Sequence, residues 1–186
     1  MTRWGNIASG ILPFNRETCE VLLQLRSDEV NEGGTWGIVG GAVSIKESTT
    51  GSYHSNEIFA TKDQVDEKFI IDSAISEFKE ETGYFDNIED VELFNLFKSK
   101  DGKFQYYSYL GMVDEKLYDI PTLYDDADKY WEAEDYEWIN PEDLINKINK
   151  EGNFNYYFHP DFYNTLRKKE VQEKIINYYE RCKKNK

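Results

Sequence analysis

The sequence has few cysteines, prolines and histidines and no long apolar run. Its two cysteines, Cys19 and Cys182, stand far apart and form neither a CxxC metal motif nor the dense framework of a disulfide-rich secreted domain, so we assign them no role. No apolar stretch approaches the roughly 18 residues of a membrane span, and the first residues are not typical of a signal peptide. We therefore expect no membrane partner and a cytoplasmic location.

Positive charge is also scarce, because 22 lysines and arginines face 36 acidic residues and the net charge is −14. Between Asp114 and Asp143, twelve acids accompany only Lys116 and Lys129. An acidic surface repels phosphate backbones, so the charge disfavours a nucleic-acid partner. Aromatic residues, in contrast, number 29 in a chain of 186, which indicates a folded globular domain and not a disordered chain.

Local patterns predict one domain over residues 1–186, in which strands interleave with helices. Strands are predicted over Ile7–Phe14, Cys19–Arg26, Thr35–Val43, Val91–Phe97, Phe104–Val113 and Tyr136–Ile139, and helices over Gln64–Thr82, after Asn140-Pro141 and over Lys168–Lys186. Polar turns join the first two strands and also the fourth and fifth, and these hairpins require antiparallel pairs. The pattern favours an α/β fold with a mixed sheet between helices over a doubly wound parallel sheet.

The helix over residues 64–82 has clear boundary signals and carries a cluster of acids. Asp63 is a candidate N-cap, and Gly83 is placed where a left-handed residue commonly ends a helix. Ile71, Ile75, Phe78 and Thr82 have the spacing of a buried stripe, while Glu77, Glu80 and Glu81 fall on another side. Like charges at this spacing repel, so the cluster is either a solvated acidic face or an oxygen-ligand site for Mg²⁺ or Mn²⁺.

These residues resemble the signature of the Nudix hydrolases, G-x5-E-x7-R-E-U-x-E-E-x-G-U, in which U is a bulky apolar residue. Gly41 and Glu47 match its first part, and the run from Glu77 to Tyr84 matches its last part. The resemblance covers roughly residues 4–150 and implies a Nudix-like α/β/α sandwich with a mixed β-sheet. It also implies a metal-dependent reaction, in which water attacks a phosphorus of a nucleoside diphosphate linked to another moiety.

The resemblance also implies which residues bind the cation. The Gly40 carbonyl and the carboxylates of Glu77, Glu80 and Glu81 match the metal-binding positions, and Glu77 and Glu81 are expected to be catalytic. Glu47 adds a further acid nearby. Ionised carboxylates in such a group titrate as a coupled cluster.

Other residues are candidates for proton transfer and for substrate binding. Glu134 is the first candidate for the general base, with Glu132 and Glu137 behind it, although a solvated surface acid is the alternative for each. Arg26 and Trp36 are expected to bind substrate, because an arginine at a strand end can contact phosphate and Trp36 lies in the glycine-rich approach to Gly41. The tyrosines at positions 106, 107 and 109 are either base-stacking or core residues, and neither histidine is assigned a role.

Two departures from the family pattern stand out. Residues 48–75 replace a motif segment of seven residues, so we expect a loop insertion over 48–65, either a tolerated surface loop or a lid. Ser76 stands where the family carries an arginine that orients the neighbouring acids, and Lys46 or Lys79 are candidates to replace it. Residues 151–186 are expected to form a helical extension.

Three functions follow in order of preference. The first is a Nudix pyrophosphohydrolase acting on a small-molecule nucleotide diphosphate derivative, whose identity the sequence does not reveal. The second is a Nudix-fold nucleotide sensor that has lost hydrolysis, for which Ser76 is the motivation. The third, mRNA decapping, is less favoured because of the net negative charge. A homodimer is compatible with all three.

Overall fold

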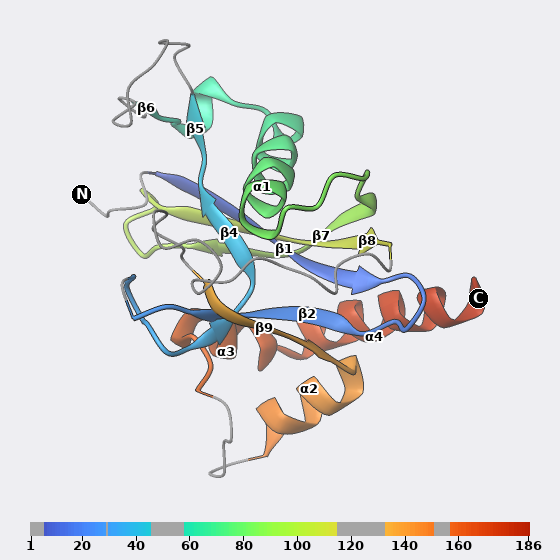
Figure 1. The fold of residues 1–186 in the computed structure, drawn as a ribbon. Helices are drawn as coiled ribbons and strands as arrows, with labels where there is room; N and C mark the ends of the chain where they lie inside the picture. Colours follow the sequence, from blue (N-terminus) through green and yellow to red (C-terminus); the bar gives the residue numbers. More distant parts are fainter. Residues whose placement is uncertain (1–5, 29, 46–57, 115–132, 151–156) are drawn as a thin grey trace.

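The computed structural model describes residues 6–28, 30–45, 58–114, 133–150 and 157–186, and the fold is described for these residues. Seven of their strands form one mixed sheet (Figure 1). These strands are β1 (Ile7–Asn15), β2 (Val21–Arg26), β3 (Trp36–Gly37), β4 (Val39–Ala42), β7 (Glu89–Lys98), β8 (Gln105–Val113) and β9 (Ala133–Ile139). The order is β3-β2-β1-β8-β7, with β4 paired to β1 and β9 paired to β2.

Strand β1 is the centre of this sheet. It pairs in parallel with β8 and antiparallel with β4, and its end pairs with β2 at Phe14 and Val21. Every residue of β1 is buried, as expected for a strand with layers on both faces. The predicted hairpins are present, since β7 and β8 are antiparallel and β2 follows β1 through a tight turn. The fold is therefore α/β with a mixed sheet, as the sequence predicts.

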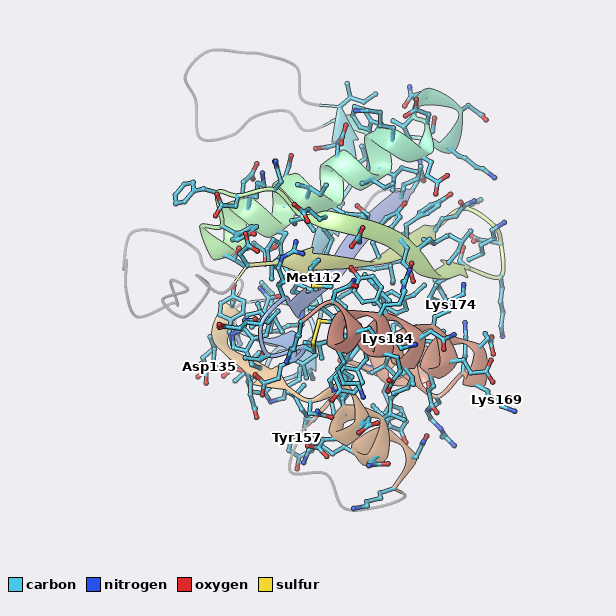
Figure 2. All side chains as sticks on the ribbon, turned by 90° about the vertical axis from the view of Figure 1, so that its right-hand side faces the viewer. Met112, Asp135, Tyr157, Lys169, Lys174 and Lys184 are labelled. Atoms are coloured by element: carbon cyan, nitrogen blue, oxygen red, sulfur yellow. A yellow bond between two sulfur atoms is a disulfide. The ribbon has the colours of Figure 1, made fainter. Side chains whose placement is uncertain are left out.

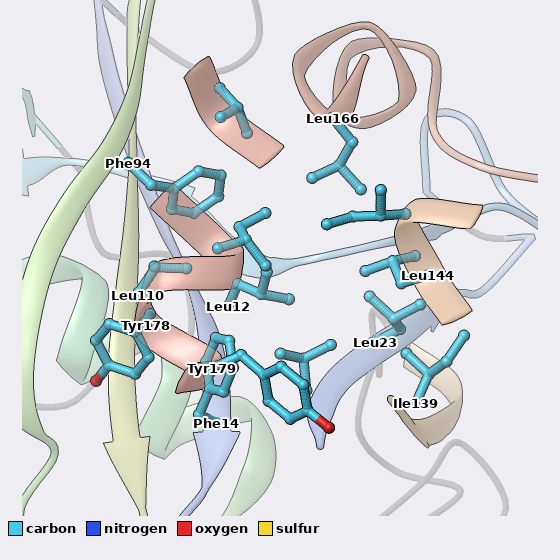
Figure 3. Packing of buried hydrophobic residues seen from close by; sticks show 14 of the residues in the cluster. Leu12, Phe14, Leu23, Phe94, Leu110, Ile139, Leu144, Leu166, Tyr178 and Tyr179 are labelled. Carbon is cyan, nitrogen blue, oxygen red and sulfur yellow. The ribbon is translucent and has the colours of Figure 1, made fainter. Parts of the chain in front are cut away.

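Helices cover both faces of the sheet. Helix α1 (Glu67–Thr82) lies over β1 and β4, and α2 (Pro141–Asn149), α3 (Pro160–Leu166) and α4 (Lys169–Lys184) lie on the opposite side (Figure 1). The core between the sheet and α2–α4 contains aliphatic side chains and the rings of Phe14, Phe94 and Tyr178 (Figure 3). A second core packs around α1. No helix within the described ranges is long and apolar enough to span a membrane.

Helix α1 begins three residues later than predicted. Asp66, not Asp63, is the N-cap, and its carboxylate accepts the Phe69 amide at 2.8 Å, whereas Asp63 lies in a short 3-10 helix, η1 (Lys62–Gln64). Two acids three residues apart compete for the same role, and the sequence does not rank them. The helix ends at Gly83 with φ +70°, as predicted.

The buried stripe of α1 also differs in part from the prediction. Ile70 and Ala74 are buried together with Phe78 and Thr82, while Ile71 and Ile75 are only half-buried. A small residue at position 74 faces the sheet and allows the helix to approach it closely, and the larger isoleucines flank the contact.

Part of the segment predicted as a loop over 48–65 is ordered structure. Strand β5 (Ser44–Ile45) pairs antiparallel with β6 (Ile58–Phe59), and η1 follows before α1. Lys46, Glu47 and the rest of residues 46–57 lie outside the described residues, as do Glu132 and residues 151–156. Residues 157–186 contain α3 and α4, whose apolar side chains form part of the main core.

Cys19 and Cys182 form a disulfide, which corrects the expectation that they have no role (Figure 2). Both residues are buried, and their Cα atoms are 5.9 Å apart. Their separation of 163 residues gave no hint of a pair, because only the completed fold brings α4 against the turn between β1 and β2. The bond therefore ties the last helix to the first hairpin.

We predict that reduction of this disulfide lowers stability. A cross-link between residues 163 apart restricts the unfolded chain, and losing a native disulfide typically costs about 2–5 kcal/mol. Urea unfolding should show a lower midpoint for the wild type in reductant, but no effect of reductant on Cys19→Ala/Cys182→Ala. Equal wild-type midpoints together with two titratable thiols in non-reducing denaturant would contradict the pairing.

Candidate active site

Two acids near the C-terminal end of α1 face the sheet, and a glycine makes room for the first of them. The carboxylate of Glu77 lies against the backbone of β4 at Gly41. A Cβ atom at Gly41 would be 2.9 Å from both Cδ and Oε2 of Glu77, closer than real Cβ contacts. The absence of a side chain at position 41 therefore allows Glu77 to occupy this place.

The second acid, Glu81, is held from strand β2. The Gln24 side-chain amide donates a hydrogen bond to Glu81 Oε2 at 2.5 Å and approaches the Tyr136 hydroxyl at 3.4 Å. Tyr136 donates in turn to the backbone carbonyl of Glu81 at 3.4 Å. Gln24 and Tyr136 are direct cross-strand partners, so β2 and β9 together fix the end of α1.

Glu80 and Ser76 are both exposed on α1, while Glu77 and Glu81 are half-buried. The described residues contain no group of three or more acidic, histidine or cysteine side chains that could by itself hold a metal ion. The donors that face the sheet are all oxygens, the type that Mg²⁺ and Mn²⁺ prefer. Glu77 and Glu81 therefore fit a hard divalent cation as part of its ligand set, and Glu47 lies outside the described residues.

Gly40, next to Gly41 on β4, is enclosed by backbone. A Cβ there would be 2.5 Å from the Ser9 carbonyl oxygen, 2.6 Å from Gly10 Cα and 2.6 Å from the Tyr106 hydroxyl. Strand β4 thus runs against β1 with no space for a side chain at this position. Because neighbouring residues on a strand face opposite sides, Gly40 borders a cavity while Gly41 borders Glu77.

The cavity has a volume of about 540 Å³, within the usual range for small-molecule sites. Its apolar walls are mainly aromatic and come from β7, the residue before β8, and α3: Phe94, Phe97, Phe104 and Phe162. Its polar residues include Arg26, Asn95, Tyr106, Ser108 and His159. The site combines flat apolar surfaces with a few polar groups, a lining suited to an aromatic ring with polar edges.

Burial fixes the protonation of two groups in this cavity. Burial raises the pKa of the Tyr106 phenol, so its hydroxyl stays protonated and remains a hydrogen-bond donor. Burial lowers the pKa of His159 from its usual 6.5, and the Arg26 guanidinium lowers it further, against smaller opposing effects of Asp161 and Glu32. His159 Nδ1 accepts the Asp161 amide at 3.2 Å, so the neutral ring carries its proton on Nε2.

The predicted substrate and base residues lie in different places. Arg26 lines the cavity, is 8% exposed and donates from Nε to the Asn31 carbonyl at 3.0 Å. Trp36 packs against the core shared with α2–α4, and its backbone bonds to Tyr157 and His159. Glu134 lies on β9 where the register with β2 shifts, a bulge of the kind that redirects side chains beside active sites.

Sequence reasoning missed Gln24, and it left the tyrosines of β8 unresolved. Gln24 interrupts the apolar run Val21–Leu25, which is the one available signal, because a polar residue inside a buried strand needs a partner. On β8 the alternation settles the tyrosines, since Tyr106 lines the cavity and Tyr107 and Tyr109 pack on the α1 side.

The family model of the NUDIX domain matches residues 6–162. No curated protein matches the chain. The Nudix hydrolase RenU from M. smegmatis has a TM-score of 0.57 and 18% identity, over 92% of this chain and 89% of that chain.

Two other solved structures share the fold, with similar TM-scores and sequence identities. The MutT protein from Methanosarcina mazei Go1 has a TM-score of 0.53 and 15% identity, over 96% of this chain and 97% of that one. The NUDIX domain of Shewanella oneidensis NrtR, solved with ADP ribose, has a TM-score of 0.53 and 14% identity, over 92% of this chain and 88% of that one. All three similarities concern the fold alone.

Alanine substitutions at the two neighbouring glycines should have contrasting effects on stability and activity. Gly40→Ala pushes a methyl group into the backbone of β1 and should lower the free energy of unfolding by about 1–3 kcal/mol. Gly41→Ala meets only the movable end of Glu77, so it should unfold near the wild-type midpoint while the expected hydrolysis falls by about 100-fold. Urea unfolding and initial rates measure both effects. A fully active Gly41→Ala would show that Glu77 does not need this position.

The lowered pKa of His159 should make the stability of the protein depend on pH. Its folded-state pKa is lowered, so the unfolded chain binds the proton more readily, and the stabilisation present above about pH 6.5 is lost as the pH falls below it. His159→Asn keeps a side-chain hydrogen-bond acceptor at the N-cap of α3 and removes the titratable imidazole. Between pH 7 and 5, roughly the window in which histidine titrates, the wild type should lose more stability than the variant. Parallel stability curves would contradict this assignment.

Proposed function

Because this chain belongs to the Nudix hydrolase family, we propose that it is a divalent-metal-dependent pyrophosphohydrolase that cleaves a nucleoside diphosphate linked to another moiety. The observation that carries the proposal is the pair Glu77 and Glu81, held toward the sheet by Gly41 and Gln24. Strand β4 separates this pair from the aromatic cavity, and Gly40 forms part of the cavity wall.

In this proposal Glu77, Glu80, Glu81 and the Gly40 carbonyl would hold Mg²⁺ or Mn²⁺. Such a cation, when bound, would neutralise the charge of the diphosphate and favour deprotonation of the attacking water. Two features support the assignment: the oxygen-only donor set, and the absence of a Cβ that would displace Glu77. Glu80 is exposed on the same turn of the helix.

The protein's own residues supply binding and proton transfer. The nucleoside enters the cavity, where Phe94, Phe97 and Phe104 provide faces for a base. Arg26 lines the same cavity and places positive charge beside the diphosphate, and the protonated Tyr106 hydroxyl donates a hydrogen bond at the cavity wall. Glu134, at the β9 bulge, accepts the proton of the attacking water on a carboxylate oxygen.

A second function is favoured by one observation at position 76. Ser76 is exposed and neutral where the family signature has an arginine, so a nucleotide-binding sensor without turnover is the alternative. Calorimetry with nucleotides in Mg²⁺ and Mn²⁺, followed by chromatography of the same samples, separates the two. Binding with no product in either metal would favour the sensor over the enzyme.

We also propose a cytoplasmic location, which the composition favours. Structural disulfides are rare in that compartment, so a Cys19–Cys182 bond that persists in cells would place the chain in an oxidising compartment instead. Alkylation of thiols in freshly lysed cells, followed by mass spectrometry, measures the state of both cysteines.

The substrate class is tested with a panel of nucleoside triphosphates, nucleotide sugars, ADP-ribose, dinucleoside polyphosphates and capped RNA, each with Mg²⁺ or Mn²⁺. We expect cleavage at a phosphoanhydride bond and a preference set by the fit of the nucleoside in the cavity of about 540 Å³. Absence of turnover on the whole panel, in protein shown to be folded, would contradict an enzymatic function.

We predict that Glu81→Gln lowers turnover at least about 100-fold, because a neutral amide is a poor ligand for a hard cation. The fold should survive, since the change removes one charge from a repelling cluster and Gln24 can still bond to the amide oxygen. Glu67→Gln, on the exposed first turn of the same helix, is the matched control and should keep its activity. An active Glu81→Gln would mean that the site is misplaced.

A further inference from the structure

We propose that Gln24 is a positioning residue that holds Glu81 for the cation and so takes the role that the family signature gives to an arginine at position 76. The inference rests on the function proposed above. Gln24 lies on β2, outside the signature. Its side chain ends in a neutral carboxamide, whereas the signature arginine ends in a charged guanidinium.

The direction of the Gln24 side chain follows from the strand. On β2, Leu22 packs in the core around α1 and Leu23 in the core on the other face, so Gln24 returns to the α1 side. There Gln24 is 2% exposed, and its amide donates to Glu81 Oε2 at 2.5 Å. The residue is therefore directed at the acid by the pleat of the strand and not by a flexible loop.

The Gln24 amide is fixed by its surroundings. Its nitrogen also approaches the Tyr136 hydroxyl at 3.4 Å, and Tyr136 is its direct cross-strand partner. A buried amide that lacks hydrogen bonds is costly, so the bond to an ionised carboxylate is the state that the fold favours. The hydrogen bond to Oε2 restricts rotation of the Glu81 carboxylate, so the orientation of this acid stays constant.

The position of the signature arginine supplies no positive charge here, because a serine occupies position 76. Ser76 is exposed, and no ion pair joins Lys79 to an acid within the described ranges, while Lys46 lies outside them. A neutral donor has a distinct consequence. It orients the carboxylate without adding positive charge, so it does not repel an incoming Mg²⁺ as a guanidinium would.

The test replaces Gln24 by methionine, which keeps the length and removes the donor. Manganese affinity, measured by calorimetry with Mn²⁺ alone, should weaken about tenfold, and kcat should fall about tenfold with KM unchanged, because partners that orient metal ligands typically contribute effects of this size. The melting temperature should not fall. Gln105→Met is the matched control, a buried glutamine on β8 that accepts from Tyr107 and should leave Mn²⁺ affinity and kcat unchanged.

A second-site variant tests the link to position 76. In the Gln24→Met background, Ser76→Arg should recover part of both Mn²⁺ affinity and kcat, because it restores an orienting donor on α1. No recovery would overturn the link to the signature arginine. A loss of Mn²⁺ affinity accompanied by a large fall in melting temperature would overturn positioning in favour of a packing role.

The outcomes also separate this inference from the proposed function. If Gln24→Met matches the wild type in Mn²⁺ affinity and kcat while Glu81→Gln is inactive, Gln24 does not position Glu81, and the hydrolase function stands. If Glu81→Gln also matches the wild type, the proposed site itself is wrong.

Discussion

The site depends on the close contact between helix α1 and strand β4 at Gly41. A side chain at this position would overlap the Glu77 carboxylate, so a backbone without a Cβ is required for this acid to lie where it does. Ala74, buried on the same helix, is small enough to allow the approach. The contact places a charged group of α1 directly beside the backbone of the central sheet.

Strand β4 then divides the site into two parts with different chemistry. Gly41 borders Glu77 of α1, and Gly40, one residue earlier, borders the aromatic cavity. The period of two along a strand gives both parts a common wall. A molecule with an aromatic ring and a charged diphosphate matches this division, since the ring favours the apolar walls and the diphosphate favours a cation bound by carboxylates.

Local signals in the sequence predicted much of the fold. Gly83 ends α1, Asn140 and Pro141 begin α2, and the Asp101-Gly102 turn joins β7 to β8. Each of these depends on the backbone preferences of one or two residues, which act over a few positions. The mixed sheet followed from the hairpins, and the family followed from the spacing of Gly41 and the acids of α1.

The remaining features depend on contacts between distant segments. The Cys19–Cys182 pair, the Gln24–Glu81 hydrogen bond and the cavity between β7, β8 and α3 each join residues far apart in the chain. Their geometry is set by how sheet and helices pack, and no local pattern encodes it. Trp36 illustrates this, because the glycine-rich segment gave no sign that the partly buried Trp36 packs against the core on the side of α2–α4, and its role in substrate binding stays a prediction.

The central claim is that Glu77 and Glu81, held toward the sheet, bind a divalent cation. The most direct measurement is a titration of Mn²⁺ followed by electron paramagnetic resonance, with no nucleotide present, on the wild type and on Glu77→Gln/Glu81→Gln. We predict saturable binding by the wild type and an affinity at least about 100-fold weaker in the double variant. Superimposable binding curves for the two proteins would contradict it.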